Sequence, residues 1–303
     1  MRTLPITVAA DADYPLPGLL TLPDGAGPFP AVLLVHGSGP QDRDEAVGPN
    51  RPFRDLAVGL AALGVASLRY DKRTFAHGKR LTDALQGRLS VEEEVIRDAL
   101  CAAALLRAEP LIRPDRVYLL GHSMGGMLAP RIDAEGGAFA GLIFWAGTPR
   151  TLDALILEQN EASLAAMPPE QRAAAAPLVQ ALREQFAALP RMAEEDAQHT
   201  HILGNLWAWY FKEMLTHPPE EYLRRLTKPV LVLQGDRDAH LSVERDFRRY
   251  EALLAAHPDA VFHLYPGLNH LFMPSPTGAI AEVLHEYQQP QAVDSQVIAD
   301  IAR

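Results

Sequence analysis

The sequence predicts an α/β protein with a mostly parallel, doubly wound sheet that is interrupted late by a helical insertion. Apolar runs that end in glycine, such as PAVLLVHG (30–37), are typical of strands buried on both faces. These runs alternate with stretches of helical spacing, which implies parallel strands joined by crossover helices on both faces. The alternation stops between 150 and 226 and then resumes. We therefore expect a core domain of residues 1–149 and 227–303, with residues 150–226 as a helical cap, or lid.

The individual elements follow from local signals along the chain. The strand at 14–25 ends in an Asp-Gly turn, and the helix at 52–64 ends in a glycine. The helix at 90–109 begins with Ser90 and Glu93, which have capping-box spacing. The predicted strands are 3–10, 14–25, 30–37, 65–71, 115–121, 139–147, 228–238 and 260–270, and the predicted helices of the core are 52–64, 90–109, 123–136, 242–257, 278–288 and 293–303.

The segment at 150–226 is alanine-rich, helical in spacing and broken by prolines, without a clear strand. Its stretch NLWAWYFKEML (205–215) gathers several aromatic residues. We expect Trp207 and Trp209, together with Trp145, to line an apolar pocket for an acyl group.

Composition excludes several classes of function. The 303 residues carry a formal net charge of −10, which opposes a sequence-independent nucleic-acid surface. Apolar runs are too short for membrane insertion, and the N-terminus lacks the features of a signal peptide, so we expect a cytoplasmic protein. No nucleotide motif is present, and HTH (199–201) lacks a further partner set for a metal, so we expect neither a cofactor nor a metal. The sequence does not indicate the oligomeric state.

The stretch GHSMG (121–125) fits the pattern G-x-S-x-G between a predicted strand and a predicted helix. In that setting the serine occupies a strained turn with its hydroxyl exposed at the carboxyl edge of the sheet. Side chains at Gly121 and Gly125 would collide across this turn. We therefore interpret Ser123 as a nucleophile rather than as part of an ordinary glycine turn.

A serine nucleophile needs a base, and the base needs a carboxylate. His270 follows the strand at 260–270 and lies on the same predicted sheet edge as Ser123, whereas we expect His122 to point away around the turn. Asp238 follows the preceding strand and has room to reach the histidine, with Asp236 as the fallback. The backbone N–H groups of Met124 and Ser38 complete the prediction as an oxyanion hole.

The stretch GHSMGGMLAPRI (121–132), together with LLVHGSGPQDRDE, GPNRPFRDLA, LRYDKR and YPGLNHLFMP, resembles the α/β-hydrolase superfamily and, within it, the EstD-type bacterial carboxylesterases. The resemblance implies hydrolysis of carboxylic esters with short to medium acyl chains, by a Ser123-Asp238-His270 triad without a cofactor, on a small-molecule substrate. The chain departs from such relatives at DAHLSVE (238–244), where they tend to carry a Gln-Val pair after the acid.

Other assignments remain open at this point. A peptidase or aminopeptidase, or a thioesterase or acyltransferase, would use the same triad, and a binding protein could share the fold. We expect Asp42, Arg43, Asp71 and Arg73 to tie the oxyanion loop to the neighbouring strand end.

Overall fold

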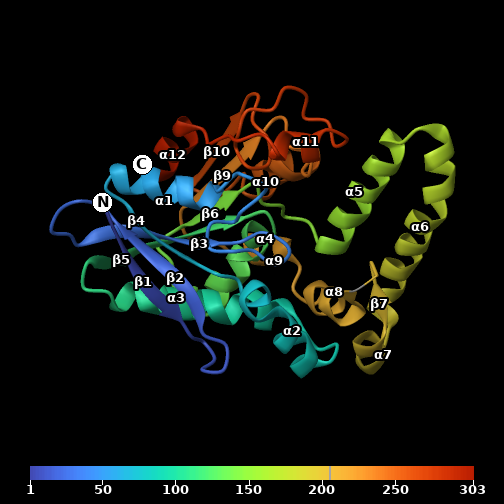
Figure 1. Ribbon diagram of the computed structural model, residues 1–303, viewed down its shortest axis with the longest axis horizontal. Coiled ribbons are helices and arrows are strands. Elements are labelled where there is room, and N and C mark those ends of the chain that lie inside the picture. Colours follow the sequence, from blue (N-terminus) through green and yellow to red (C-terminus); the bar gives the residue numbers. More distant parts are fainter. Residues whose placement is uncertain (205) are drawn as a thin grey trace.

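The computed structural model describes residues 1–204 and 206–303, and within them eight strands form one twisted sheet (Figure 1). The strand order is β1-β2-β4-β3-β5-β6-β9-β10, in which β2 runs antiparallel to both of its neighbours and all other pairs are parallel. The strands are β1 (Arg2–Val8), β2 (Leu16–Leu22), β3 (Phe29–Val35), β4 (Ala66–Tyr70), β5 (Ile112–His122), β6 (Leu142–Trp145), β9 (Val230–Gly235) and β10 (Ala260–Tyr265). The predicted fold class is confirmed.

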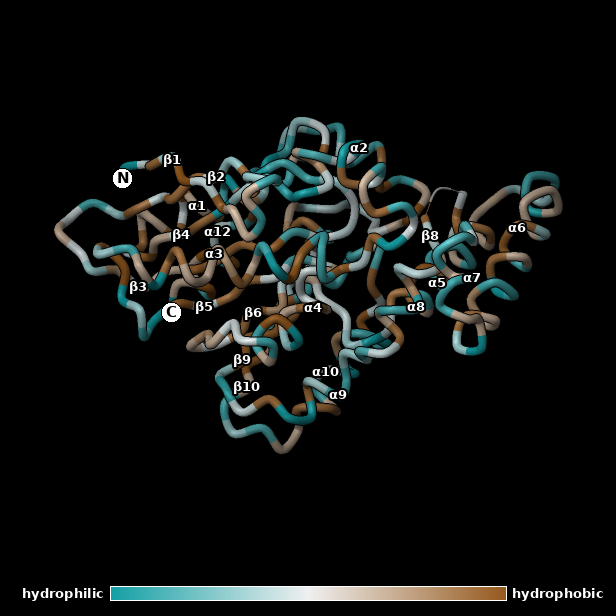
Figure 2. Tube along the Cα trace, turned by 90° about the horizontal axis from the view of Figure 1, so that it is seen from below, coloured by the Kyte–Doolittle hydropathy of each residue, from teal (hydrophilic) through white to brown (hydrophobic). Residues whose placement is uncertain are grey.

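Helices cover both faces of the sheet, as crossover connections require. Helices α1 and α12 pack together on one face, where Gly59 leaves room for Ile298, and α3 and α4 lie on the other (Figure 1). Apolar residues concentrate in the strands of this core (Figure 2). The helices of the core are α1 (Pro52–Ala62), α2 (Arg73–Leu85), α3 (Arg97–Ala108), α4 (Met124–Ile132), α10 (Arg248–Leu253), α11 (Val283–Tyr287) and α12 (Ser295–Ala302).

Several boundaries differ from those predicted. Helix α2 was not expected, because its 13 residues bury only Arg73 and Leu81 and so carry little apolar signal. The helix expected at 278–288 is reduced to α11. Short π-helical turns precede or follow regular helices at η1 (Glu92–Ile96), η2 (Asp133–Gly137) and η4 (Val243–Phe247). The capping hydrogen bonds predicted at Ser90 are present, since its N–H donates to Glu93 Oε2 over 3.2 Å.

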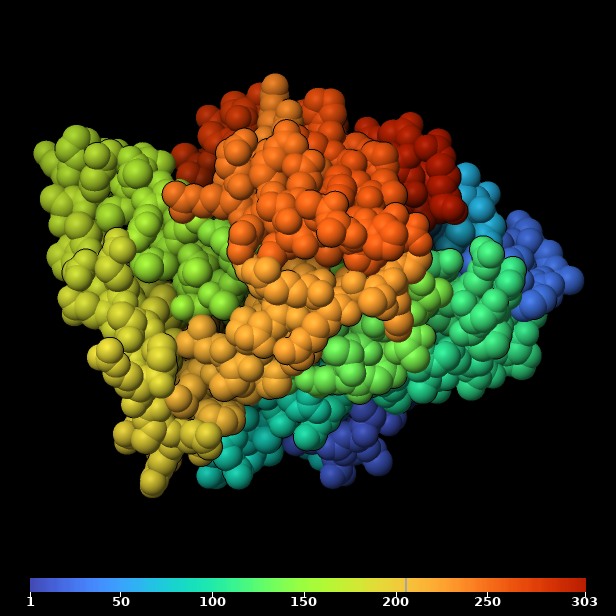
Figure 3. Space-filling model, turned by 180° about the vertical axis from the view of Figure 1, so that it is seen from behind, coloured from blue at the N-terminus to red at the C-terminus, as the bar shows by residue number. Residues whose placement is uncertain are grey.

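Between β6 and β9 the chain leaves the sheet and forms a separate group of helices along one flank of the molecule (Figure 3). We call residues 150–226 the helical insertion. It contains one pairing of two-residue strands, which the sequence did not indicate, and Asn205 of the aromatic stretch lies outside the described residues. Its elements are α5 (Leu152–Ala166), α6 (Pro169–Ala188), the 3₁₀ turn η3 (Leu189–Arg191), α7 (Glu194–His199), β7 (His201–Ile202), β8 (Leu206–Trp207), α8 (Ala208–Leu215) and α9 (Pro219–Leu223).

Candidate active site

Ser123 lies at the sharp turn between β5 and α4. Its backbone angles are φ 52° and ψ −114°, in a region that residues with a side chain rarely adopt. A Cβ atom at Gly121 would collide with the Gly125 carbonyl, and one at Gly125 with the Val35 carbonyl, so both positions require glycine. Ser123 lines a cleft, and the following helix begins at Met124 with N–H groups that lack intrahelical acceptors.

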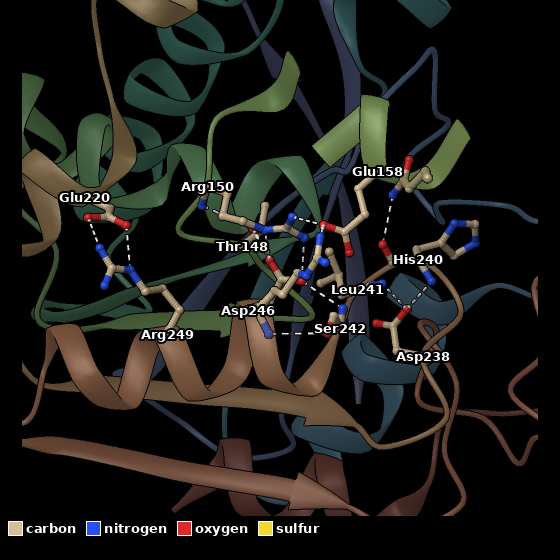
Figure 4. A network of polar contacts seen from close by, with 12 residues as sticks. Thr148, Arg150, Glu158, Glu220, Asp238, His240, Leu241, Ser242, Asp246 and Arg249 are labelled. Carbon is tan, nitrogen blue, oxygen red and sulfur yellow. Dashed lines mark hydrogen bonds and ion pairs between the residues drawn. The ribbon is translucent and has the colours of Figure 1, made fainter. Parts of the chain in front are cut away.

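His270 and Asp238 form a hydrogen-bonded pair at the same edge of the sheet. His270 Nδ1 lies 2.7 Å from Asp238 Oδ2, and the Asp238 side chain is fully buried. The other carboxylate oxygen accepts the N–H groups of His240 and Leu241, at 2.8 and 3.0 Å (Figure 4). Burial opposes the charge on Asp238, but His270 and, to a smaller extent, His240 outweigh it and lower the pKa of the carboxyl group. The pair is thus suited to fix the histidine tautomer.

Asp236, the alternative acid, has a different role. It is exposed, and its Oδ1 accepts the Gly267 N–H over 2.6 Å. This contact joins the loop after β9 to the loop after β10 and leaves Asp236 apart from His270.

Ser123 and His270 both line a cleft of about 310 Å³ at the base of the helical insertion. Ser38 belongs to the same cleft, and Met124 follows Ser123 directly. Among the described residues, no hydrogen bond joins the Ser123 hydroxyl to His270; such contacts often tighten only when substrate is bound. The apolar wall of the cleft comes from Val47, Leu152, Leu155, Ile156 and Leu271.

The expected tryptophan pocket differs from the observed one. Trp145 is fully buried behind the site and stacks on Phe272, with ring centroids 4.9 Å apart. Trp207 packs on His201, and Trp209 borders a separate surface hollow. None of the three is among the residues that line the cleft, which takes its apolar surface chiefly from α5 instead.

His122 does not point away from the site, contrary to expectation. Its Nε2 lies 3.1 Å from the His270 carbonyl oxygen, and its Nδ1 lies 3.0 Å from Glu45 Oε1. Both partners are acceptors, so the doubly protonated imidazolium fits the arrangement. Burial disfavours that charge, but Glu45 and the carbonyl outweigh it and raise the pKa of His122. Sequence reasoning missed this pair because Glu45 lies 77 positions before its partner.

The loop that carries Ser38 is held by charged groups, though not all of those expected. Arg43 contacts Asp71 through its Nε at 2.9 Å and its Nη2 at 2.8 Å, and Asp42 Oδ1 accepts the N–H groups of Asp44 and Ala46. Arg73 instead pairs with buried Asp98, which joins the start of α2 to α3 rather than to this loop. Its neighbour Lys72 contacts the loop directly, a role that the sequence did not indicate.

A polar network anchors the insertion beside the site. Asp246 accepts from the Thr148 hydroxyl and from Arg150 Nε, at 2.5 and 2.7 Å, and Arg150 also pairs with Glu158 of α5 (Figure 4). These contacts fix the start of α5, the helix that lines the cleft, to the core.

Two further features bear on what the site can bind. Across the described residues, no group of three His, Cys, Asp or Glu side chains is arranged to hold a metal ion. His199 contacts the Glu195 carbonyl, and His201 faces Trp207. Over the same part of the chain, no helix has both the length and the apolar character needed to cross a membrane.

Comparison with known proteins places this geometry in a family. Residues 32–283 match the model of the alpha/beta hydrolase family. The chain is 36% identical to Esterase EstD of Thermotoga maritima over 95% of its own length and 65% of that protein's, so it spans about two thirds of that relative. It is 22% identical to the Uncharacterized peptidase YtmA of Bacillus subtilis, over 90% of this chain and 88% of that protein.

A solved structure shares the fold across the whole chain. Est1E from Butyrivibrio proteoclasticus covers 99% of this chain and 99% of its own, with a TM-score of 0.58 and 16% identity. Because the family model covers most of the sequence and the eight-stranded sheet agrees with it, the chain belongs to the α/β hydrolase family.

Proposed function

We propose that the protein hydrolyses carboxylic esters of short to medium acyl chains through an acyl-enzyme on Ser123. The observation that carries the proposal is the Asp238–His270 hydrogen bond of 2.7 Å at the cleft in which the strained Ser123 lies. Similarity to Esterase EstD supports an ester as the substrate. The cleft of about 310 Å³ has the size of a small-molecule site.

In the proposed reaction, His270 Nε2 accepts the Ser123 proton while the serine oxygen attacks the ester carbonyl carbon. Asp238 holds the imidazole in the correct tautomer and stabilises its positive charge. The N–H groups of Ser38 and Met124 donate to the oxyanion. His270 then gives its proton to the departing alcohol, which leaves the acyl group on Ser123. Water repeats the sequence, with His270 as base, and releases the acid.

We infer that the helical insertion acts as a cap that shapes the acyl pocket. Leu152, Leu155 and Ile156 recur at helical spacing on α5, and all three line the cleft beside Ser123. An acyl chain in the cleft would contact this face, so α5 rather than the tryptophans would select its length.

The experiment that tests the proposal compares the wild type with Ser123→Ala. We expect the substitution to lower kcat on 4-nitrophenyl esters by about 10⁴-fold or more, because it removes the nucleophile and leaves the fold intact. A fluorophosphonate probe should label the wild type at Ser123 and leave the variant unlabelled.

A panel of matched esters, amides and thioesters separates the proposed activity from that of a peptidase or thioesterase. The highest kcat/KM is expected for the esters. Near-normal esterase activity in Ser123→Ala with an unchanged circular dichroism spectrum would refute the nucleophile.

A further inference from the structure

Lys72 is a buried cation that donates two hydrogen bonds to backbone carbonyls and forms an ion pair with a buried carboxylate. Its side chain is 2% exposed, and its Nζ lies 3.0 Å from the Gly37 carbonyl, 3.0 Å from the Gly39 carbonyl and 3.1 Å from Glu94 Oε1. Its backbone N–H also donates to the Gln41 carbonyl over 3.0 Å. One residue therefore holds the loop at three points on both sides of Ser38.

The contact with Gly37 fixes the direction of the proposed oxyanion donor. The Gly37–Ser38 peptide bond is trans, so the Gly37 C=O and the Ser38 N–H lie in one plane and point in opposite directions. Because Lys72 binds the carbonyl oxygen on the core side, the Ser38 N–H must point the other way, and Ser38 lines the cleft. A cation on the carbonyl also polarises the amide, which makes its N–H a stronger donor.

The backbone N–H of Gly37 already has an acceptor and is not available to a substrate. It donates to Glu45 Oε1 over 2.7 Å. The loop is therefore clamped at the Gly37 N–H by a carboxylate and at the Gly37 carbonyl by an ammonium, and Ser38 provides the next N–H along the chain.

Glu94 extends the contact from Lys72 to the helical insertion. Glu94 lies in the π-helical turn η1, an irregularity often found at functional sites. Its Oε1 forms the ion pair with Lys72 and accepts the Thr74 hydroxyl, and its Oε2 accepts the Tyr210 hydroxyl over 2.5 Å. Tyr210 belongs to α8, is buried, and also lies 3.5 Å from the Met124 sulfur. The chain of contacts thus reaches the peptide group that contains the Ser38 N–H, through the Gly37 carbonyl, and the side chain of Met124.

We propose that Lys72 is a positioning residue that orients and polarises the Gly37–Ser38 amide toward the oxyanion, and that Glu94 and Tyr210 connect this support to the helical insertion. The inference rests on the proposed serine-hydrolase function and deepens it. It assigns a catalytic role to the buried Lys72–Glu94 ion pair. If the pair were only structural, its removal would not change catalysis in the folded protein.

The test measures oxyanion stabilisation separately from folding. Variants are Lys72→Met, the charge-neutral pair Lys72→Met with Glu94→Gln, and Tyr210→Phe. Each is assayed for kcat and KM on an ester, and for inhibition by a trifluoromethyl ketone and its methyl ketone parent. The first ketone forms a tetrahedral oxyanion on serine, whereas the second binds mainly as a neutral ground-state analogue. Unfolding midpoints are recorded for each variant.

We expect kcat to fall about 30-fold in both Lys72 variants and about 5-fold in Tyr210→Phe, with KM within about twofold of the wild type. The preference for the trifluoromethyl ketone over its parent should fall by the same factors. If unpaired Glu94 prevents Lys72→Met from folding, the double variant and Tyr210→Phe carry the comparison.

Tyr265→Phe is the matched control. It removes another tyrosine-to-carboxylate hydrogen bond, from Tyr265 to Asp300 at 2.9 Å, away from the cleft. It should leave kcat and the ketone preference unchanged.

Folded Lys72 and Tyr210 variants that retain kcat and ketone preference within about twofold of the wild type would overturn the inference. If Ser123→Ala is inactive and unlabelled in the same experiment, the proposed function stands and only the role of Lys72 falls. An unlabelled wild type overturns both.

Discussion

The helix that follows Ser123 in the sheet core and the longest helix of the helical insertion bury very different shares of their residues. All nine residues of α4, which follows Ser123, are buried, whereas the 20-residue α6 buries only Leu182 and Phe186. The groups proposed to carry out the chemistry thus lie on a densely packed support, and the insertion contributes one face of α5. We propose from this comparison that the core carries most of the bond chemistry, whereas α5 of the insertion supplies the contacts to the acyl chain.

One ion pair from each region shows a similar contrast. In the core, Arg73 and Asp98 pair at 2.6 Å with side chains at most 2% exposed. In the insertion, Arg183 and Glu161 pair at 2.5 Å but are 52% and 39% exposed. Exposed pairs of this kind contribute little to stability, whereas removing one partner of a buried pair leaves an uncompensated charge. Removing one partner of a buried pair should therefore cost more stability than removing one partner of an exposed pair.

The largest effect is expected from Gly125→Ala, at the turn of the core. The added methyl group would lie against the Val35 carbonyl and 2.6 Å from the His36 carbonyl, so the turn must shift. We expect loss of measurable esterase activity and destabilisation by about 3 kcal/mol, from urea unfolding.

Gly78→Ala is its matched control. Gly78 lies in α2, and apart from the adjacent residues and backbone of its own helix no atom lies within 4 Å of the new methyl group. The substitution should therefore stabilise the protein by roughly 0.5 kcal/mol and leave activity unchanged. Wild-type activity in Gly125→Ala would contradict the close approach of the backbone at this turn.

The contrast between these glycines shows what the sequence could predict. GHSMG (121–125) encodes its turn locally, in five neighbouring residues, and the order of strands and helices follows from local periodicity. The contacts of Lys72 depend on how three separate segments meet, and no local pattern marks them. Lysine side chains are more often solvated than buried, so nothing in LRYDKR singled out Lys72.

His36 offers a prediction of intermediate size, through pH. Burial lowers the pKa of His36 from 6.5 to about 4, with Lys72 adding to the effect and Glu45 opposing it. Below pH 6.5 the unfolded chain therefore binds a proton that the folded protein does not. Stability should fall as pH decreases from 6.5 to about 4, and the part due to His36 is about 3 kcal/mol.

His36→Gln should flatten this pH dependence, measured as the unfolding free energy at several pH values. Exposed His199, in the insertion, is the control, and His199→Gln should follow the wild type. Parallel acid destabilisation of the wild type and His36→Gln would contradict the assignment.

The lining of the cleft was less predictable than the turn at Ser123, and the tryptophans show why. Aromatic residues signal burial, but they do not specify which cavity they border. Trp145 fills the core behind His122, with ring centroids 4.9 Å apart, and the cleft is lined by aliphatic side chains of α5. The spacing of apolar residues along a helix identifies the face that is buried, but not the surface against which that face packs. Only the structure therefore shows that Leu155 lines the same cleft as Ser123.

The smallest effect is expected within the insertion itself, from Leu155→Ala compared with Leu178→Ala. Leu155 is 6% exposed and lines the cleft, whereas Leu178 on α6 is 73% exposed. Removing the Leu155 side chain should lengthen the pocket, because it opens space beside the proposed acyl site. The kcat/KM ratio of octanoate to acetate esters should then rise about tenfold, while the same ratio for Leu178→Ala stays at the wild-type value. Both variants should keep the wild-type rate with the acetate ester within about threefold, because the groups proposed to carry out the chemistry lie in the core. An unchanged ratio in Leu155→Ala would instead mean that the acyl chain leaves the cleft along another wall, and the division between chemistry and substrate contact would have to be redrawn.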